Sequence, residues 1–154
     1  MVFGLLLARA GVDVTVLEKH GDFLRDFRGD TVHPTTLRLL DELGLWPEFA
    51  ELPQSHVRNV TFDARPDHSV TMVSFERLRQ PHPYIAMVPQ WDLLNLLAEA
   101  AAAEPTFTLR MNTEVTELLR EGGRAKSAPQ VAAQCDEVNL VVAGCALPIK
   151  PQRN

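Results

Sequence analysis

The sequence LLLARAGVDVTVLEKH, at residues 5–20, decides the fold. Residues 2–10 place apolar side chains at helical spacing, and Gly11 stands where a helix commonly ends on a left-handed glycine. Residues 12–17 are rich in β-branched side chains and predict a strand that ends directly before Glu18. A helix that leads through a glycine into a short apolar strand is typical of parallel α/β structure.

The pattern continues with a second helix and then a group of strands. Pro34 is a favourable first helical residue, Leu37, Leu40 and Leu43 follow at helical spacing, and Gly44 ends the stripe. Three consecutive strands, a helix with a wide apolar face and two further strands come next, at 57–62, 69–75, 84–88, 89–103, 107–110 and 114–119. The first helix and strand are typical of a parallel sheet, whereas consecutive strands are typical of antiparallel pairing. The sequence therefore predicts an α/β domain with an antiparallel insertion.

The composition excludes several classes of protein. The chain has 154 residues, 45% hydrophobic and 23% charged, which are the proportions of one globular domain. The net charge of −5 without a basic cluster argues against nucleic-acid binding. No apolar run is long enough for a transmembrane segment, and the start does not resemble a secretion signal, so we expect a cytoplasmic protein. Cys135 and Cys145 do not form a zinc motif, and we expect no metal site.

The carboxylate of Glu18 is the first candidate for a binding site. In a dinucleotide-binding βαβ unit, an acid at the carboxyl end of the strand accepts hydrogen bonds from the adenosine ribose. Glu18 stands at that position, but the glycine-rich turn G-x-G-x-x-G is absent from the sequence. The alternative is that Glu18 is a solvated carboxylate at a strand end, and both interpretations stay open at this point.

Residues 8–45 carry a more specific pattern. After Glu18, an arginine follows at Arg28, and residues 34–45 read P-x-x-L-x-x-L-x-x-L-G-L. This order resembles the N-terminal region of the flavin-dependent aromatic hydroxylases, the group A flavoprotein monooxygenases of the p-hydroxybenzoate hydroxylase type. In that family the chain opens with a strand and a glycine-rich turn, followed by a helix and a strand ending in Glu.

The resemblance extends to two later segments and covers roughly residues 1–124. YIAMVPQWDLLNLLAEAA at 84–101 is similar to the family's segment in which Gln or Arg opens a helix near the flavin. TEVTELLREGGR at 113–124 is similar to the strand pair after that helix. The resemblance implies an α/β fold: an incomplete FAD-binding, Rossmann-like domain of the p-hydroxybenzoate hydroxylase type, with part of an antiparallel substrate-domain sheet.

Three site residues follow from the resemblance. Glu18 is implied to bind the adenosine ribose of FAD, and Arg28 to contact its pyrophosphate side, a task that suits a planar and always charged guanidinium. The alternative for Arg28 is a surface ion pair with Asp26 or Asp30. Gln90 is implied to lie near the flavin at a helix start, where free N–H groups favour phosphate, and its alternative is an ordinary first-turn residue.

The resemblance also implies the reaction. Members of the family reduce FAD with NADH or NADPH and use O₂ to hydroxylate an aromatic or related small molecule. The flavin carries this chemistry while the protein holds it and excludes water, so no catalytic residue is assigned. Two alternatives remain: a catalytically inactive, truncated fragment without bound cofactor, and a different nucleotide-binding α/β module such as an NAD-binding unit.

The resemblance predicts the domain organisation as well. Residues 1–54 and 89–124 are expected to form a partial FAD-binding domain, residues 55–88 to be inserted strands of the substrate domain, and residues 125–154 to be a divergent tail. We expect a fragment lacking family features at both ends, with unpaired strand edges, weak or no flavin binding and poor solubility.

Overall fold

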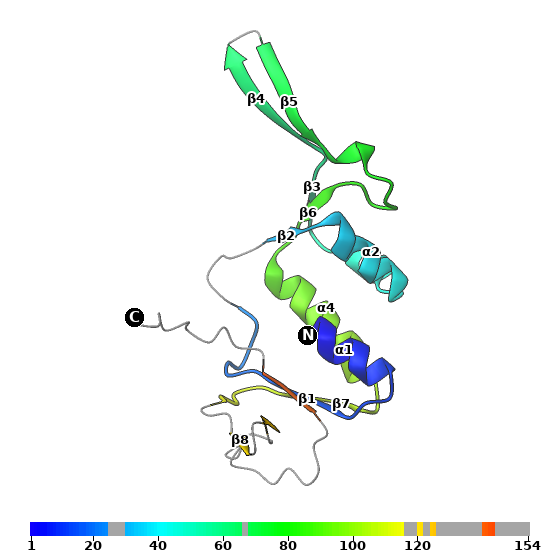
Figure 1. The fold of residues 1–154 in the computed structure, drawn as a ribbon, viewed down its shortest axis with the longest axis vertical. Helices are drawn as coiled ribbons and strands as arrows, with labels where there is room; N and C mark the ends of the chain where they lie inside the picture. The colour runs from blue at the N-terminus through cyan, green and yellow to red at the C-terminus, as the bar shows by residue number, and fades with distance from the viewer. Residues whose placement is uncertain (25–29, 66–67, 116–119, 122–123, 126–139, 144–154) are drawn as a thin grey trace, which may run out of the picture. The chain divides into compact units, whose positions relative to one another are not determined.

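The structure, a computed structural model, describes residues 1–24, 30–65, 68–115, 120–121, 124–125 and 140–143. The chain divides into two compact units (Figure 1). The first contains Met1–Phe23 and Leu97–Asn154, and the second contains Leu24–Leu96. The second unit is therefore an insertion in the chain of the first.

The first unit is built on a parallel sheet of three strands. Strand β1 (Val14–Leu17) lies in the centre, between β7 (Phe107–Arg110) and β10 (Leu140–Ala143). Leu17 lies opposite both Arg110 and Ala143, so the three strands end at one edge of the sheet. All four residues of β1 are buried, as expected for a central strand of a parallel sheet.

Helix α1 (Val2–Arg9) packs on this sheet. No side-chain cap bonds its first turn, and Gly11 adopts the left-handed conformation with a φ of 79° just beyond its end. The predicted helix, glycine stop and strand are thereby confirmed. The core of the unit consists of apolar side chains from the helices and strands, at Leu5, Ala8, Val14, Val16, Leu17, Leu97, Ala101 and Phe107.

The second unit combines two short helices with an antiparallel sheet. Helices α2 (Pro34–Glu42) and α3 (Trp46–Ala50) pack together, and the sheet has the strand order β2 (Thr31–Val32), β6 (Ile85–Met87), β3 (Ser55–Val57). Pro34 opens α2, and Gly44 follows it with a φ of 72°, as predicted. The core consists of Val32, Leu37, Leu40, Leu45, Phe49, Tyr84, Ala86 and Val88.

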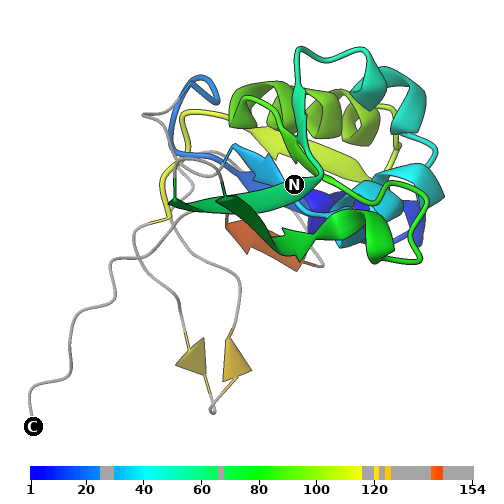
Figure 2. The ribbon, with the colours of Figure 1, turned by 90° about the horizontal axis from the view of Figure 1, so that it is seen from above.

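A separate two-stranded ribbon completes the second unit (Figure 1; seen from above in Figure 2). Its strands are β4 (Asn59–Arg65) and β5 (His68–Ser74), and a short 3₁₀ helix, η1 (Phe75–Arg77), follows. The prediction of one strand over 57–62 is wrong, because Val57 pairs with Ile85 in one sheet while β4 pairs with β5 in another. At Arg58 the chain leaves the sheet of β3 and β6 and enters the β4–β5 ribbon. Strand propensities of single residues do not predict such a change of partner.

The remaining elements lie between 90 and 125. Helix α4 (Gln90–Ala102) precedes β7, and β8 (Arg120–Glu121) pairs with β9 (Arg124–Ala125). The prediction of a strand over 114–119 is wrong at 114 and 115, which lie outside any strand, and positions 116–119 lie outside the described residues. No helix in the described part of the chain is both long and apolar enough to cross a membrane. The mixture of a parallel and an antiparallel sheet confirms the predicted α/β class.

Candidate functional site

The candidate site lies at the edge of the parallel sheet where the strands end. Glu18 directly follows β1, and its backbone N–H donates a hydrogen bond to the carbonyl of Arg110 at the end of β7, 2.9 Å away. Glu18 is only 7% exposed, so the alternative of a solvated strand-end carboxylate is wrong. The carboxyl group is oriented locally, because its Oε1 accepts a hydrogen bond of 3.0 Å from the backbone N–H of His20.

Two loops are tied together beside this carboxylate. The N–H of Thr113 donates to the carbonyl of Glu18 at 2.8 Å, and the N–H of Asn112 donates to the carbonyl of His20 at 3.0 Å. Asn112 adopts a left-handed conformation with a φ of 53°, which asparagine tolerates better than most residues. A Cβ on Gly21 would lie 3.0 Å from Oδ1 of Asn112, so the loops approach closely at this position.

Gly4 is a site-shaping residue that sequence reasoning missed. A Cβ at this position would lie 2.8 Å from Cγ2 of Val16 and 3.1 Å from Cε2 of Phe107. The missing side chain therefore lets α1 press against the strands. In a dinucleotide-binding unit the last glycine of the motif has this packing role. The signal was present in the sequence as one glycine inside an otherwise apolar helix.

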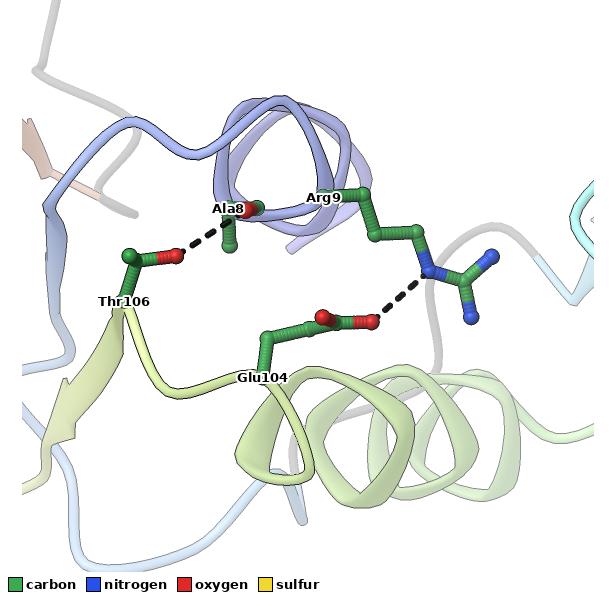
Figure 3. Close-up of polar contacts among 4 residues, drawn as sticks. All are labelled: Ala8, Arg9, Glu104 and Thr106. Carbon is green, nitrogen blue, oxygen red and sulfur yellow. Dashed lines mark hydrogen bonds and ion pairs between the residues drawn. The ribbon is translucent and has the colours of Figure 1, made fainter.

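Two polar contacts hold the end of α1 to the segment between α4 and β7 (Figure 3). Oγ1 of Thr106 donates a hydrogen bond of 2.9 Å to the carbonyl of Ala8, and Nε of Arg9 lies 3.1 Å from Oε1 of Glu104. The carbonyl of Ala8 lies in the last turn of the helix and also accepts from the N–H of Gly11 at 2.9 Å, so the Thr106 hydroxyl is a further donor to it. These contacts fix the C-terminal end of α1 to the segment that leads into β7.

Of the other two predicted site residues, Gln90 belongs to the second unit and Arg28 lies outside the described residues. Gln90 is exposed and is the first residue of α4, as predicted. Arg28, together with its alternative partner Asp26, lies outside the described residues. The structure therefore places Glu18 and Gln90 at the element ends expected of them, and the binding roles of Glu18, Arg28 and Gln90 stay predictions.

The second unit contains an aromatic cluster that sequence reasoning did not anticipate. The rings of Trp46 and His82 stack with their centroids 3.4 Å apart, and those of His56 and Tyr84 stack at 4.0 Å. The guanidinium of Arg58 lies 5.6 Å from the centroid of Tyr84. Burial, and secondarily the charge of Arg58, lower the pKa of His56, and burial raises the pKa of Tyr84 against the opposing effect of Arg58.

Nε2 of His82, at the centre of this cluster, makes no hydrogen bond within the described part of the chain, although Oδ2 of Asp41 lies 3.5 Å away. The four rings therefore form a packed cluster in which both histidines lie against larger aromatic side chains.

Comparison with known proteins assigns the family. Residues 1–139 match the family described as FAD binding domain. The 6-methylpretetramide 4-monooxygenase of Streptomyces rimosus is 31% identical over 123 residues, which are 80% of this chain and 29% of that protein. The chain thus spans less than a third of the length of this relative.

Solved structures agree on the fold. The p-nitrophenol 4-monooxygenase PnpA from Pseudomonas putida DLL-E4 is 23% identical, with a TM-score of 0.65 over 77% of this chain and 30% of that one. PqsL from P. aeruginosa, in complex with 2-aminobenzoylacetate, is 20% identical, with a TM-score of 0.61 over 77% and 32% of the two chains. The resemblance stated from the sequence is confirmed, and the chain belongs to the FAD binding domain family.

Proposed function

We propose that this chain supplies the adenosine-binding part of an FAD-dependent monooxygenase that hydroxylates an aromatic or related small molecule. The observation that carries the proposal is the buried carboxylate of Glu18 at the carboxyl edge of a parallel sheet, where such sheets bind nucleotides. The family match and the name of the relative, a monooxygenase, support the reaction class. NADH or NADPH as reductant and O₂ as co-substrate belong to the proposal.

The residues present fit the adenosine end of FAD. A carboxylate has about four acceptor sites, so Glu18 can accept from a ribose hydroxyl while it also holds the bond from the His20 N–H. Gly4 brings α1 against the strands, as a dinucleotide-binding unit requires. Bound FAD would supply the redox chemistry, and Glu18 would orient the ribose.

Arg28 and Gln90 complete the proposed contacts. The proposed role of Arg28 is to bind the pyrophosphate side of FAD, since a guanidinium pairs with two phosphate oxygens at once. The proposed role of Gln90 is to lie close to the flavin, at the N-terminal end of α4 where backbone N–H groups favour an anion. Its exposure is consistent with access to a ligand.

We also keep the predicted domain organisation as a proposal. Residues 1–54 and 89–124 would form the partial FAD-binding domain, and 55–88 the inserted strands of the substrate domain. The antiparallel pairing of β3 to β6 supports the insertion. The proposed divergent tail, 125–154, includes β10, which pairs with β1.

The test is a comparison of FAD and FMN binding by the purified chain, followed through flavin fluorescence. Glu18→Gln removes the charge but keeps the shape, and we expect it to weaken FAD binding roughly tenfold, since a hydrogen bond to a charged group contributes about 1.5–3 kcal/mol. Binding of FMN, which has no adenosine, should not change. Glu51→Gln, at an exposed position of the second unit, is the matched control.

Two results would contradict the proposal. Equal effects of Glu18→Gln and Glu51→Gln on FAD binding would remove Glu18 from the site. A correctly folded chain that does not bind FAD at any accessible concentration would favour the alternative, a fragment without cofactor.

A further inference from the structure

The parallel ladder between β1 and β7 ends directly beside Glu18. In a regular parallel pair, the N–H of a residue donates to the carbonyl before its partner, and its own carbonyl accepts from the N–H after that partner. Val14 pairs with Phe107 and donates to the carbonyl of Thr106 at 2.8 Å. Glu18 continues this pattern, because its N–H donates to the carbonyl of Arg110 at 2.9 Å.

Asn112 interrupts the pattern. A regular ladder would continue with a bond from the N–H of Asn112 to the carbonyl of Glu18, but the N–H of Thr113 makes that bond at 2.8 Å. The N–H of Asn112 donates instead to the carbonyl of His20 at 3.0 Å. The chain after β7 thus contains one residue more than the ladder needs, which is the arrangement of a β-bulge. The extra residue is Asn112, and its φ of 53° is left-handed, as in bulges that begin with a left-handed glycine.

The displaced bond reaches the segment that orients the carboxylate of Glu18. The N–H groups of Thr113 and Asn112 hold the carbonyls of Glu18 and His20, which lie at the two ends of residues 18–20. Within this segment the N–H of His20 donates to Oε1 of Glu18 at 3.0 Å. In a regular ladder the His20 carbonyl would lose the bond from Asn112, so the bulge and the orientation of the carboxylate belong to one arrangement.

Gly21 allows Asn112 to lie close to this segment. A Cβ at Gly21 would lie 3.0 Å from Oδ1 and 3.4 Å from Nδ2 of Asn112, so the amide lies against the backbone that follows His20. Gly21 and Asn112 are exposed, whereas Glu18 is buried. A substitution at Asn112 therefore changes the loop and leaves the core of the unit in place.

We propose that Asn112 is a positioning residue of the nucleotide site, whose left-handed backbone holds residues 18–20 so that the carboxylate of Glu18 is preoriented for the ribose of FAD. The inference rests on the proposed function, and it adds a residue that acts through Glu18 without touching the cofactor. A carboxylate that is fixed before the ligand arrives loses little conformational freedom on binding, which raises affinity. Loss of the left-handed conformation should therefore weaken the binding of FAD but not of FMN, which has no adenosine.

The test compares two substitutions that both remove the amide of Asn112, with binding to the purified chain followed through flavin fluorescence. Asn112→Ala disfavours the left-handed conformation, whereas Asn112→Gly retains it. We expect Asn112→Ala to weaken FAD binding roughly fivefold, because the apparent dissociation constant rises as the binding-competent fraction falls. Asn112→Gly should recover most of this loss, and FMN binding should be equal in both variants and the wild-type chain.

A double-mutant cycle with Glu18→Gln separates positioning from a general loss of stability. If Asn112 acts through the carboxylate, Asn112→Ala should weaken FAD binding by less than about twofold in a chain that already carries Glu18→Gln. A purely structural role would reduce the affinity by the same factor in both backgrounds. Circular dichroism and urea titrations of each variant report whether it folds like the wild-type chain.

Several outcomes would overturn the inference and leave the proposed function intact, provided that Glu18→Gln alone weakens FAD binding. Unchanged FAD binding in Asn112→Ala is one, and an equal loss in Asn112→Gly, which would assign the role to the amide, is another. A loss that FMN shares, a loss that Glu18→Gln does not reduce, or failure of Asn112→Ala to fold would show a structural role only. FAD binding that does not depend on Glu18 would overturn the proposed function and this inference together.

Discussion

At the scale of single residues, Gly4 shows how one missing side chain shapes a site. Replacing glycine by alanine inside a helix normally stabilises it by about 1 kcal/mol. At Gly4 the new Cβ would lie 2.8 Å from the stiff, β-branched side chain of Val16, and overpacking of this kind costs about 1–3 kcal/mol. The packing cost therefore exceeds the gain in helix propensity.

We predict that Gly4→Ala lowers the free energy of unfolding by about 1 kcal/mol in urea titrations. The control is a double-mutant cycle with Val16→Ala, which removes the contacting methyl group. The double variant should lose less stability than the sum of the two single variants. An increase in stability on Gly4→Ala alone would contradict the close approach of α1 to β1.

The surroundings of His56 lower the pKa of its imidazole, and this affects the stability of the chain at low pH. Partial desolvation of the His56 ring, which stacks on Tyr84 but is otherwise exposed, and to a smaller degree the charge of Arg58 disfavour the imidazolium, so the pKa of His56 should lie below its usual value of 6.5. The unfolded chain then binds the proton more readily than the folded one. This contribution to stability is present at neutral pH and is lost as the pH falls below 6.5 through the lower, folded-state pKa.

A titration of the histidine resonances by NMR checks this prediction, with His56→Gln used for assignment. Arg58→Gln should raise the pKa of His56 only part of the way to 6.5, because burial is the larger cause. Full recovery in Arg58→Gln would show instead that the guanidinium dominates. Arg79→Gln, at an exposed position of the same unit, should leave the titration unchanged.

At the scale of elements, two contacts hold the C-terminal end of α1, and they contribute unequally to the free energy of unfolding. The Arg9–Glu104 pair has side chains 33% and 26% exposed, and ion pairs near the surface contribute little. The Thr106 hydroxyl bonds the carbonyl of Ala8, which itself is buried at 4% exposure. The N–H of Gly11 also donates to this carbonyl at 2.9 Å, so loss of the Thr106 bond removes one of its donors and costs about 0.5–1.5 kcal/mol, the net contribution of one hydrogen bond.

We predict that Thr106→Val destabilises the chain by about 1 kcal/mol in thermal or urea unfolding, since valine keeps the shape but not the donor. Thr106→Ser, which keeps the hydroxyl, should recover most of the stability. Arg9→Gln should cost less than Thr106→Val. The reverse order of the two losses would mean that the ion pair, rather than the hydroxyl, holds the helix end.

At the scale of the whole molecule, segments far apart in the sequence surround β1. Its neighbours are β7, reached after the entire second unit, and β10, near the end of the chain. Residues 1–139 match the family, so β10 lies just beyond the matched region and yet pairs with all four residues of β1. The central strand of the candidate site therefore depends on a segment outside the family match.

We predict that a chain ending at residue 139 exchanges the amide hydrogens of β1 at least roughly tenfold faster than a chain ending at residue 143. The shorter chain loses one complete edge of the parallel sheet, while the longer one keeps β10. Hydrogen exchange followed by mass spectrometry measures the difference, and the peptides of α2 in the second unit are the internal reference. Equal exchange in the two chains would show that the pairing of β10 does not support β1.

The sequence by itself determined the local elements and the position of the candidate carboxylate. Gly11 and Gly44 end their helices in the left-handed conformation, and Glu18 follows the β-branched strand, because these features depend on neighbouring residues alone. The family resemblance on residues 1–124 was likewise readable from spacing and residue type, and the family match confirms it.

Only the tertiary structure decided what surrounds those elements. The contact of Gly4 with Phe107, and the tie between Asn112 and His20 beside the buried Glu18, depend on segments brought together across the inserted unit. The division between β3 and β4 was also decided there, because β3 pairs with β6 while β4 pairs with β5 in a different sheet. Propensity and periodicity describe a segment and its neighbours, whereas packing selects which distant segment satisfies its hydrogen bonds and covers its apolar side.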